Sequence, residues 1–228
     1  MIGIIAALDG EVQDIKKEMV SEEILEYAGM RFYKGLLFGK PAVAVRCGVG
    51  KVNAGICTQV LVDRFGVEAV INVGIAGGLA KGLRVGDLVI GKDAVQYDMD
   101  ASAFGHPVGE IPNMDITYFP ADERLVNLAK NAASGLGAIA LVGRILTADK
   151  GVGSTALKEQ LRADFDGACV EMEGAAIAQA AYINKIPYCV IRSISDNADD
   201  SAAETYEENF AQSMKNAAAM VLEMIKNY

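Results

Sequence analysis

Tryptophan and histidine are almost missing from this sequence, which has no Trp and one His among its 228 residues. A Ser-His-Asp triad would depend entirely on His106, and no Gly-x-Ser-x-Gly nucleophile elbow is present. No cluster of His, Cys and Asp has the spacing of metal ligands, so we expect no metal site. The chemistry expected of this chain therefore uses neither a histidine-activated serine nor a bound metal.

Basic residues are too few and too dispersed for a nucleic-acid-binding protein. The chain has 21 Lys and Arg against 30 Asp and Glu, a formal net charge of -9. Phosphate backbones are bound by clustered Lys and Arg, so we expect no nucleic-acid partner. The apolar start MIGIIAAL has no basic n-region and is too short for a signal or membrane segment. We expect it to form a buried first strand, and we expect no membrane association.

Cysteine is sparse, and no Cys-x-x-Cys pair occurs. Each of the four cysteines stands among Val, Ile and Ala without a histidine nearby: Cys47, Cys57, Cys169 and Cys189. Scattered cysteines in apolar surroundings are typical of reduced core residues. We therefore expect a cytoplasmic protein without disulfides.

Short β-branched runs alternate with amphipathic segments along the whole chain. This alternation predicts an α/β fold with a largely buried sheet. No repeat, linker or break in composition divides the sequence, so we expect a single domain over residues 1–228. The expected strands are Ile2–Ala6, Ala42–Cys47, Ala69–Val73, Asp87–Gly91, Ala138–Leu146, Ala168–Val170 and Tyr188–Ser193.

Apolar residues at helical spacing predict the helices between these strands. One stripe is Leu8, Val12, Ile15 and Met19, a second is Val52, Ile56 and Val60, and a third is Phe210, Met214, Ala217, Val221 and Ile225. Asn184 and Pro187 predict a helix end before the last strand. Residues 97–118 instead mix Gly, Pro and Asp with an exposed-looking Phe104, which predicts a long functional or interface loop.

Two glycine-rich turns follow expected strands. Arg46–Gly55 opens a helix, but the G-x-G-x-x-G fingerprint fails at Asn53 and the P-loop pattern fails too, so no nicotinamide or other cofactor is expected. Gly74, Gly77 and Gly78 follow the third strand. They allow either a tight turn or the close approach of a ligand to the bare backbone.

Four acids stand out because each follows an apolar strand. They are Glu11, Glu171, Glu173 and Asp196. Each taken alone could cap a helix or occupy its first turn. Carboxylates from the ends of several strands can also converge on one crevice. Cleavage of an N-glycosidic bond would use such a set, since one acid can activate water, one can hold the sugar and one can protonate the leaving base.

The motifs GIIAALDGEV, CGVGKVNA, NVGIAGGL, SAFG, VEMEGAAIA and IRSISDNAD occur in this order from residue 2 onward. Together they resemble the 5′-methylthioadenosine/S-adenosylhomocysteine nucleosidases of the purine nucleoside phosphorylase superfamily. The resemblance covers the chain to about residue 225 and implies a three-layer phosphorylase/hydrolase-like fold. In that fold a central mixed, twisted sheet is flanked by helices. It also implies a role in methionine salvage, and hence in amino-acid biosynthesis.

The resemblance implies a role for each acid. Glu11 would activate the attacking water, and Glu173 would hold the ribose hydroxyls. Asp196, steadied by Ser195, would protonate the purine at N7 and accept from its exocyclic amine. Glu171 would lie behind Glu173.

The resemblance also implies which residues bind the rest of the nucleoside. Val152 would present backbone groups to the adenine edge, Gly77 would lie close to the base and sugar, and Met172 would pack along the nucleoside. Tyr206 would lie near the base or the 5′ group, and the rest of the implied pocket is Leu8, Val49 and Ile75. The family is homodimeric, and the loop of the partner subunit that closes the 5′ pocket matches Ala101, Phe104 and Pro112.

Two positions depart from the family pattern. Ile75 stands where the family usually has Ser, and Gly151 stands where it usually has a Phe that stacks on adenine. These departures keep open a non-catalytic purine-binding or sensor protein. A phosphorylase is the other alternative, but Glu11 would repel phosphate, so water is the favoured nucleophile. The 5′ substituent stays open among methylthio, homocysteinyl, 5′-deoxy and aminofutalosine groups.

Overall fold

The computed structural model describes residues 1–228, except for the side chain of Ser21. Ten strands form one mixed sheet in which β5 lies near the centre. The strands are β1 (Ile2–Ala6), β2 (Met19–Tyr27), β3 (Met30–Leu37), β4 (Lys40–Arg46), β5 (Ala69–Gly78), β6 (Leu88–Gln96), β7 (Phe119–Pro120), β8 (Ala140–Thr147), β9 (Gly167–Glu171) and β10 (Tyr188–Asp196).

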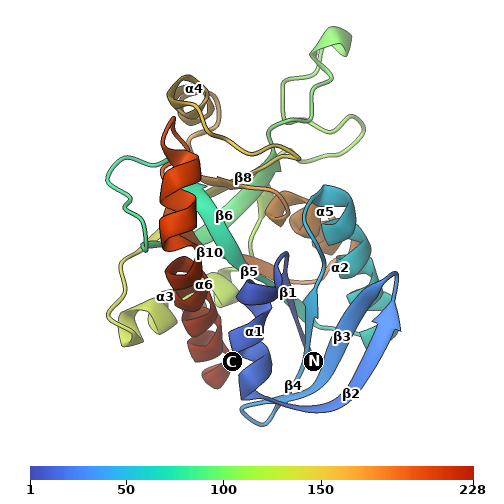
Figure 1. Ribbon diagram of the computed structural model, residues 1–228. Helices are drawn as coiled ribbons and strands as arrows, with labels where there is room; N and C mark the ends of the chain where they lie inside the picture. Colours follow the sequence, from blue (N-terminus) through green and yellow to red (C-terminus); the bar gives the residue numbers. More distant parts are fainter.

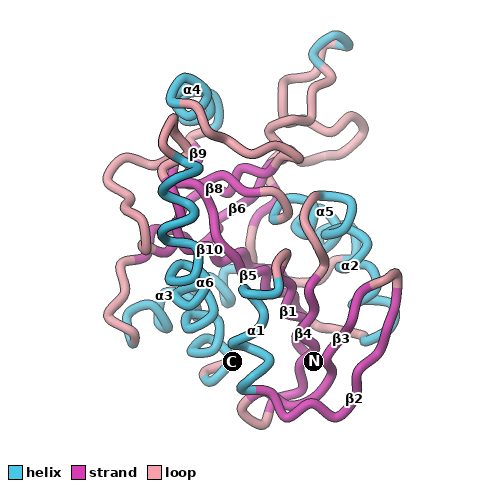
Figure 2. The backbone as a smooth tube through the Cα atoms, in the orientation of Figure 1, coloured by secondary structure: helices cyan, strands magenta, loops and turns pink.

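The sheet curls until part of it closes on itself. Its strand order is β10-β6-β8-β9-β5-β1-β4-β3-β2, and β10 pairs in addition with β5. Strands β1, β4, β5 and β10 run parallel along their shared pairings. Their carboxyl ends therefore lie on the same side of the molecule, where open α/β folds usually bind ligands. Figure 2 shows the strands running through the middle of the molecule between helices.

Helices cover both faces of the sheet, which gives the three layers expected (Figure 1). On one face α1 (Asp9–Glu18), α3 (Glu123–Gly135) and α6 (Ala202–Lys226) pack over an apolar core that includes Ile4, Ile71 and Val221. On the other face α2 (Lys51–Phe65) and α5 (Gly174–Asn184) pack over a second core that includes Val70 and Ile177. The helix α4 (Thr155–Phe165) precedes β9 and contacts it.

All seven expected strands are present, and three extend further than expected. β5 continues from Val73 to Gly78, β6 from Gly91 to Gln96 and β10 from Ser193 to Asp196. The added residues mix apolar residues with glycines and polar residues, which interrupts the continuous apolar run that predicts a strand, and those of β5 and β10 include Gly77 and Asp196, which border a cavity. The hairpin β2–β3 and the short β7 were not predicted.

Two helix stripes need correction. Met19 does not continue the stripe of α1, because it is the C-cap of that helix and the first residue of β2. In α2, Val52 and Ile56 are 71% and 44% exposed, so these two residues of the stripe face outward, whereas Val60 packs partly buried against the core. The face of α2 that packs on the protein is instead made of Ala54, Cys57, Thr58 and Leu61.

Residues 97–118 form a long irregular arm, as predicted. In Figure 1 the arm is the green segment that projects away from the body. It contains one short 3-10 turn, η1 (Ser102–Phe104), and Phe104 is 85% exposed. All four cysteines are buried and free. None of the helices in the described part of the chain combines the length and apolarity that a membrane span needs.

Candidate active site

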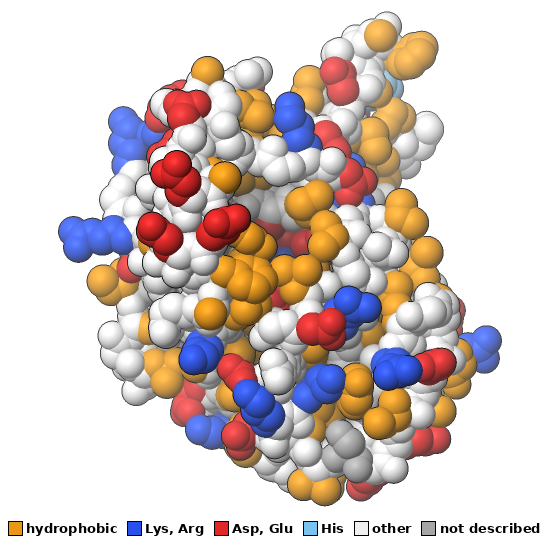
Figure 3. Space-filling view, viewed as in Figure 1, with side chains coloured by type: hydrophobic (Ala, Val, Ile, Leu, Met, Phe, Trp, Pro, Cys, Tyr) orange, Lys and Arg blue, Asp and Glu red, His pale blue; other side chains and the backbone are white. Residues whose placement is uncertain are grey.

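A cavity of about 550 Å³ opens at the carboxyl ends of β1, β5, β9 and β10. Figure 3 shows the hollow on this face, with acidic atoms in its depth and hydrophobic side chains around it. Twelve residues predicted for the site line this one cavity: Leu8, Glu11, Val49, Ile75, Gly77, Val152, Met172, Glu171, Glu173, Ser195, Asp196 and Tyr206. Segments spread over almost 200 residues of sequence thus meet in one place.

Glu11 lies in the first turn of α1 and is only 3% exposed. Its Oε2 accepts from the backbone N–H groups of Ala7 (2.9 Å) and Leu8 (2.8 Å), and its Oε1 accepts from that of Ile75 (3.1 Å). Burial raises the pKa of this carboxyl, although Arg192 and the three N–H donors act in the opposite direction. Glu11 is therefore both a first-turn acid of α1 and a desolvated group of the cavity.

The carboxylate of Glu171 accepts hydrogen bonds from four donors, so it is not free to bind a ligand. Its Oε1 accepts from the Thr147 hydroxyl, and its Oε2 accepts from Arg192 and from the N–H groups of Glu173 (3.1 Å) and Gly174 (2.7 Å). These last two donors belong to the start of α5, so Glu171 caps that helix. Glu171 lines the cavity from behind Glu173, as expected.

Glu173 comes directly before α5 and is 6% exposed. Its one hydrogen bond is accepted by Oε1 from the N–H of Gly50 (2.8 Å), which leaves Oε2 available to a ligand. Burial and the nearby charge of Glu171 raise the pKa of Glu173 to about 7, against a lowering effect of Arg192. Glu173 therefore changes its ionisation nearer to neutral pH than an exposed Glu does.

Arg192 is the buried cation that these three acids share. It is 1% exposed and donates to Glu171 and to Asn72 Oδ1 (2.6 Å). Burial alone would lower its pKa, but the charges of Glu171, Glu173 and Glu11 together raise the pKa of Arg192 above its usual value. A permanently charged guanidinium thus sits beneath the floor of the cavity.

Asp196 ends β10, lines the cavity and is 8% exposed. Its Oδ2 accepts from the Ser195 hydroxyl (2.8 Å), and its Oδ1 accepts from the N–H of Ala198 (2.8 Å). Burial raises the pKa of Asp196, and these two hydrogen bonds only partly oppose that rise. An acid in this environment holds a proton at higher pH than an exposed Asp does.

Small residues shape the wall beside Asp196. A β-carbon on Gly77 would lie 2.9 Å from Ala198 Cβ and 3.0 Å from Asp196 Oδ1, so only Gly fits there. A β-carbon on Gly151 would meet no atom within 4 Å. The loop that contains Gly151, Val152 and Gly153 therefore borders the cavity with bare backbone, which can lie close to a flat ligand.

Three predicted residues lie away from this cavity. Ala101, Phe104 and Pro112 belong to the arm, and none of them lines the cavity of its own chain. They were expected to act on the cavity of a partner subunit, so this position agrees with that expectation without testing it.

Several functional neighbours were not predicted. Thr147 and Asn72 hold Glu171 and Arg192 from other strands, while Lys150, Ala202 and Ala203 line the cavity. Thr147 and Asn72 did carry a signal, because each is a polar residue within or at the end of an apolar strand run. Lys150, Ala202 and Ala203 carried no such signal, because they reach the cavity only through the folded positions of the loop after β8 and the start of α6.

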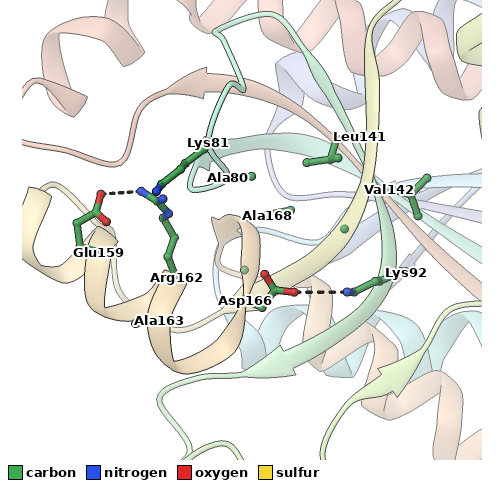
Figure 4. Close-up of a pocket in the computed structure, with 12 residues that line it drawn as sticks. Ala80, Lys81, Lys92, Leu141, Val142, Glu159, Arg162, Ala163, Asp166 and Ala168 are labelled. Atoms are coloured by element: carbon green, nitrogen blue, oxygen red, sulfur yellow. Dashed lines mark hydrogen bonds and ion pairs between the residues drawn. The ribbon is translucent and has the colours of Figure 1, made fainter.

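A second hollow of about 590 Å³ lies elsewhere, between α4 and β8 (Figure 4). Four of its ionic residues form two pairs: Arg162 lies 2.6 Å from Glu159, and Lys92 lies 3.8 Å from Asp166. Its two acids are exposed or at the surface, with Asp166 91% exposed at the side chain. Desolvated carboxylates distinguish the first cavity, although the second is slightly larger.

The described residues include no group of three or more His, Cys, Asp or Glu side chains placed to hold a metal ion. The first cavity instead offers three acids whose pKa values are raised by burial, namely Glu11, Glu173 and Asp196. They come from three different elements and surround a volume typical of small-molecule sites. Perturbed acids in a cleft are characteristic of catalytic sites.

Known proteins share both the sequence and the fold. A family model described as the phosphorylase superfamily matches residues 1–226. The 5′-methylthioadenosine/S-adenosylhomocysteine nucleosidase of Staphylococcus carnosus is 37% identical over 228 residues, which cover 100% of both chains.

Solved structures agree with this assignment. The nucleosidase of the same name from Neisseria meningitidis, in complex with methylthio-immucillin-A, has a TM-score of 0.96 at 36% identity, covering 100% of this chain and 99% of that one. A futalosine hydrolase of Helicobacter pylori has a TM-score of 0.95 at 34% identity, covering 100% and 97%. The chain therefore belongs to the phosphorylase superfamily and, within it, to the 5′-methylthioadenosine/S-adenosylhomocysteine nucleosidases.

Proposed function

We propose that this enzyme hydrolyses the N-glycosidic bond of 5′-substituted adenosines, releasing adenine and the 5′-substituted ribose. 5′-Methylthioadenosine and S-adenosylhomocysteine are the proposed substrates, with 5′-deoxyadenosine as a further one, and methionine salvage is the proposed metabolic role. The observation that carries this proposal is the meeting of Glu11, Glu173 and Asp196 in one cavity, each with a pKa raised by burial.

The three acids divide the reaction between them. Protonated Asp196 donates its proton to N7 of the purine, so that adenine leaves as a neutral base while positive charge develops on the ribose. Ionised Glu11 takes a proton from the attacking water, whose oxygen then bonds to C1′. Ionised Glu173 accepts hydrogen bonds from the sugar hydroxyls. Each positioned proton transfer contributes on the order of 10²–10⁴ in rate, and the pairing of an acid with a base across the sugar resembles inverting glycosidases.

The rest of the cavity suits a flat base and a short apolar tail. Ser195 steadies Asp196, the backbone around Val152 borders the base, and Met172 packs along the nucleoside. Leu8, Val49 and Tyr206 supply apolar surface. No cofactor is needed, because hydrolysis requires only proton transfer and water.

Water, not phosphate, is the proposed nucleophile. A phosphorylase must hold a phosphate anion beside the ribose with Arg, Lys or hydroxyl donors. On the sugar side of this cavity lie the carboxylates of Glu11 and Glu173 and the apolar side chain of Ile75, and Lys150 is the one basic residue of the lining. Two carboxylates there would repel a phosphate dianion.

We also propose a homodimer in which each arm closes the partner's 5′ pocket. Exposed apolar side chains on α2 and α5 support this, since Val52 is 71% and Ile183 is 61% exposed. The Asn184 amide of α5 donates to Gln59 of α2 (2.8 Å), so the two helices form one surface. Contiguous apolar surface of this kind usually marks a protein interface. The free, buried cysteines support a cytoplasmic location.

A panel of nucleosides tests the function. 5′-Methylthioadenosine, S-adenosylhomocysteine, 5′-deoxyadenosine, aminofutalosine and inosine would be incubated with and without phosphate, and free base would be measured. Release of adenine without phosphate is the expected result. A requirement for phosphate, with formation of a ribose 1-phosphate, would establish the phosphorylase alternative. Binding of adenine without any turnover would instead indicate a sensor, the alternative that Ile75 and Gly151 leave open.

A further inference from the structure

Three segments meet at the rim of the cavity around Lys51, the first residue of α2. The backbone N–H of Lys51 donates to Asp149 Oδ1 (2.8 Å), and its Nζ donates to Asp98 Oδ1 (2.6 Å). The N–H of Asp149 in turn donates to Asp98 Oδ2 (3.2 Å). Asp98 begins the arm, and Asp149 belongs to the loop 148–153 that borders the cavity.

The positive charge at the start of α2 is paired with acidic residues from other parts of the chain, and not with acids of α2 itself. A Lys at the first position of a helix is unfavourable, because the N-terminus already carries partial positive charge. The first turn of α2 contains no acidic residue, and its N-cap is Gly50, which has no side chain to cap it. Asp149 and Asp98 supply the missing acceptors from 98 and 47 residues away. The Lys51 and Asp98 side chains are only 18% and 31% exposed, so this ion pair is partly desolvated.

The cluster reaches Glu173 through a single residue, Gly50. Gly50 donates its N–H to Glu173 Oε1 (2.8 Å), while the next N–H, that of Lys51, donates to Asp149. Gly50 has φ of 100°, and a β-carbon there would lie 3.1 Å from Asp149 Oδ1. Gly50 is therefore held on both sides: the N–H before its Cα bonds Glu173 on the cavity side, and the N–H after it bonds Asp149 on the rim side.

We propose that Asp149, Lys51 and Asp98 act as a positioning clamp for the reaction. The clamp fixes Gly50, whose N–H orients Glu173 toward the sugar, and it fixes the loop 148–153 that borders the base. These residues act through Glu173 and the loop and do not themselves touch the reacting atoms. The proposal rests on the proposed function, in which Glu173 accepts from the ribose hydroxyls.

The test uses the discrimination between 5′-methylthioadenosine and its 3′-deoxy analogue. The ratio of their kcat/KM values reports how well Glu173 is held against the sugar hydroxyl. Both substrates are measured on the same preparation, so the fraction of correctly folded enzyme cancels from the ratio. The variants are Asp149→Ala, which removes the acceptor, Asp149→Asn, which keeps an oxygen acceptor, and Lys51→Met, which removes the ion pair but keeps the N–H. The matched control is Lys34→Met, which breaks an exposed ion pair with Glu23 on the β2–β3 hairpin.

Asp149→Ala is expected to lower the ratio by about 10-fold or more, because a loosely held acceptor discriminates less in the transition state. Lys51→Met should lower it less, Asp149→Asn should retain most of it, and Lys34→Met should leave it unchanged. An unchanged ratio in Asp149→Ala, with wild-type enzyme active, overturns the clamp and leaves the proposed function standing. A wild type that does not cleave 5′-methylthioadenosine overturns the proposed function, and the clamp with it.

Discussion

The guanidinium of Arg192 and the carboxylate of Glu171 form an ion pair whose side chains are 2% and 3% exposed. Removal of one partner of such a pair leaves an uncompensated buried charge, which typically costs about 3–5 kcal/mol. We expect Arg192→Met to lower the free energy of unfolding by about this amount, measured by urea denaturation. Arg31→Met is the control, because the Arg31–Glu26 pair is 70% and 67% exposed. Equal losses in the two variants would contradict the structural role of Arg192.

Gly74 leaves room for Glu11. A β-carbon at Gly74 would lie 2.7 Å from Glu11 Oε1 and 3.2 Å from Arg192 Nη1. Gly74→Ala should therefore displace the proposed base and lower kcat by roughly 10²-fold, within the range for one proton transfer. Gly135→Ala serves as the control, since no atom lies within 4 Å of a β-carbon there. Wild-type kcat in Gly74→Ala would mean that Glu11 has no part in catalysis.

Asp196→Asn should separate proton donation from binding. The amide keeps the shape of the carboxyl but has no proton to give to N7, so kcat should fall on the order of 10²–10⁴-fold. Adenine binding, measured by calorimetry, should change much less. Ser195→Ala removes only the hydroxyl that donates to Asp196 Oδ2 (2.8 Å) and should have a smaller effect. Turnover by Asp196→Asn at the wild-type rate would exclude Asp196 as the acid.

Glu173 should give the enzyme an acid limb in its pH profile. The carboxyl must be ionised to accept from the sugar hydroxyls, and its pKa is raised to about 7 by burial and by Glu171. The value of kcat/KM should therefore rise with pH through about 7. Glu173→Gln, assayed for its residual activity, should lack this limb. A limb that persists there would assign the titration to another group.

The raised pKa of Glu173 also affects stability, which should fall with rising pH while activity rises. The raised pKa of Glu173 means that the folded state favours the protonated form, so its stabilising contribution is complete below 4.5 and is lost as pH rises through about 7. Thermal unfolding should show that Glu173→Gln loses less stability than wild type between pH 5 and about pH 8, because Gln does not ionise. The exposed Glu22→Gln is the control and should follow wild type.

The outward stripe of α2 predicts a quaternary effect. Val52 and Ile56 are 71% and 44% exposed, and Ile183 on the adjoining helix α5 is 61% exposed. A charge in the centre of an apolar interface is strongly unfavourable, so Ile56→Glu should shift the protein toward monomers in sedimentation and lower activity with it. Val20→Glu, at a 70% exposed position on β2, should change neither. A wild type that is monomeric at assay concentration would contradict the proposed dimer.

The sequence was a good guide where a buried strand is a continuous apolar run. The strand β1 and the first part of β10 were predicted for this reason. The hairpin was missed because β2 reads MVSEEILEY, in which three acids interrupt the alternation of an edge strand. The exposure of Val52 and Ile56 on α2 could not be predicted. A hydrophobic stripe indicates a face that is covered, but it does not indicate whether the covering surface belongs to the same chain.

The acids of the cavity could be found because carboxylates inside apolar runs are costly and so attract notice. Their surroundings could not be found in the same way. The N–H groups that hold Glu11 and Glu173 belong to Ile75 and Gly50, and backbone donors leave no trace in side-chain identity. The clamp around Lys51 joins residues 47 and 98 positions apart through surface-type side chains, whose pairing depends on the folded geometry alone.

The sharing of one cation among three carboxylates means that ionisation of Glu11 and Glu173 adds negative charge that Arg192 cannot balance. Arg192 can balance only one of Glu11, Glu171 and Glu173, and its contacts are made mainly to Glu171. The surplus negative potential is unfavourable for a neutral sugar but is complementary to the positive charge that the ribose gains as its bond to adenine breaks. Electrostatic preorganisation of this kind lets an enzyme bind the transition state more tightly than the substrate. In the ionised form that the proposed reaction uses, the site therefore carries a repulsion between carboxylates that the positive charge of the reacting sugar relieves.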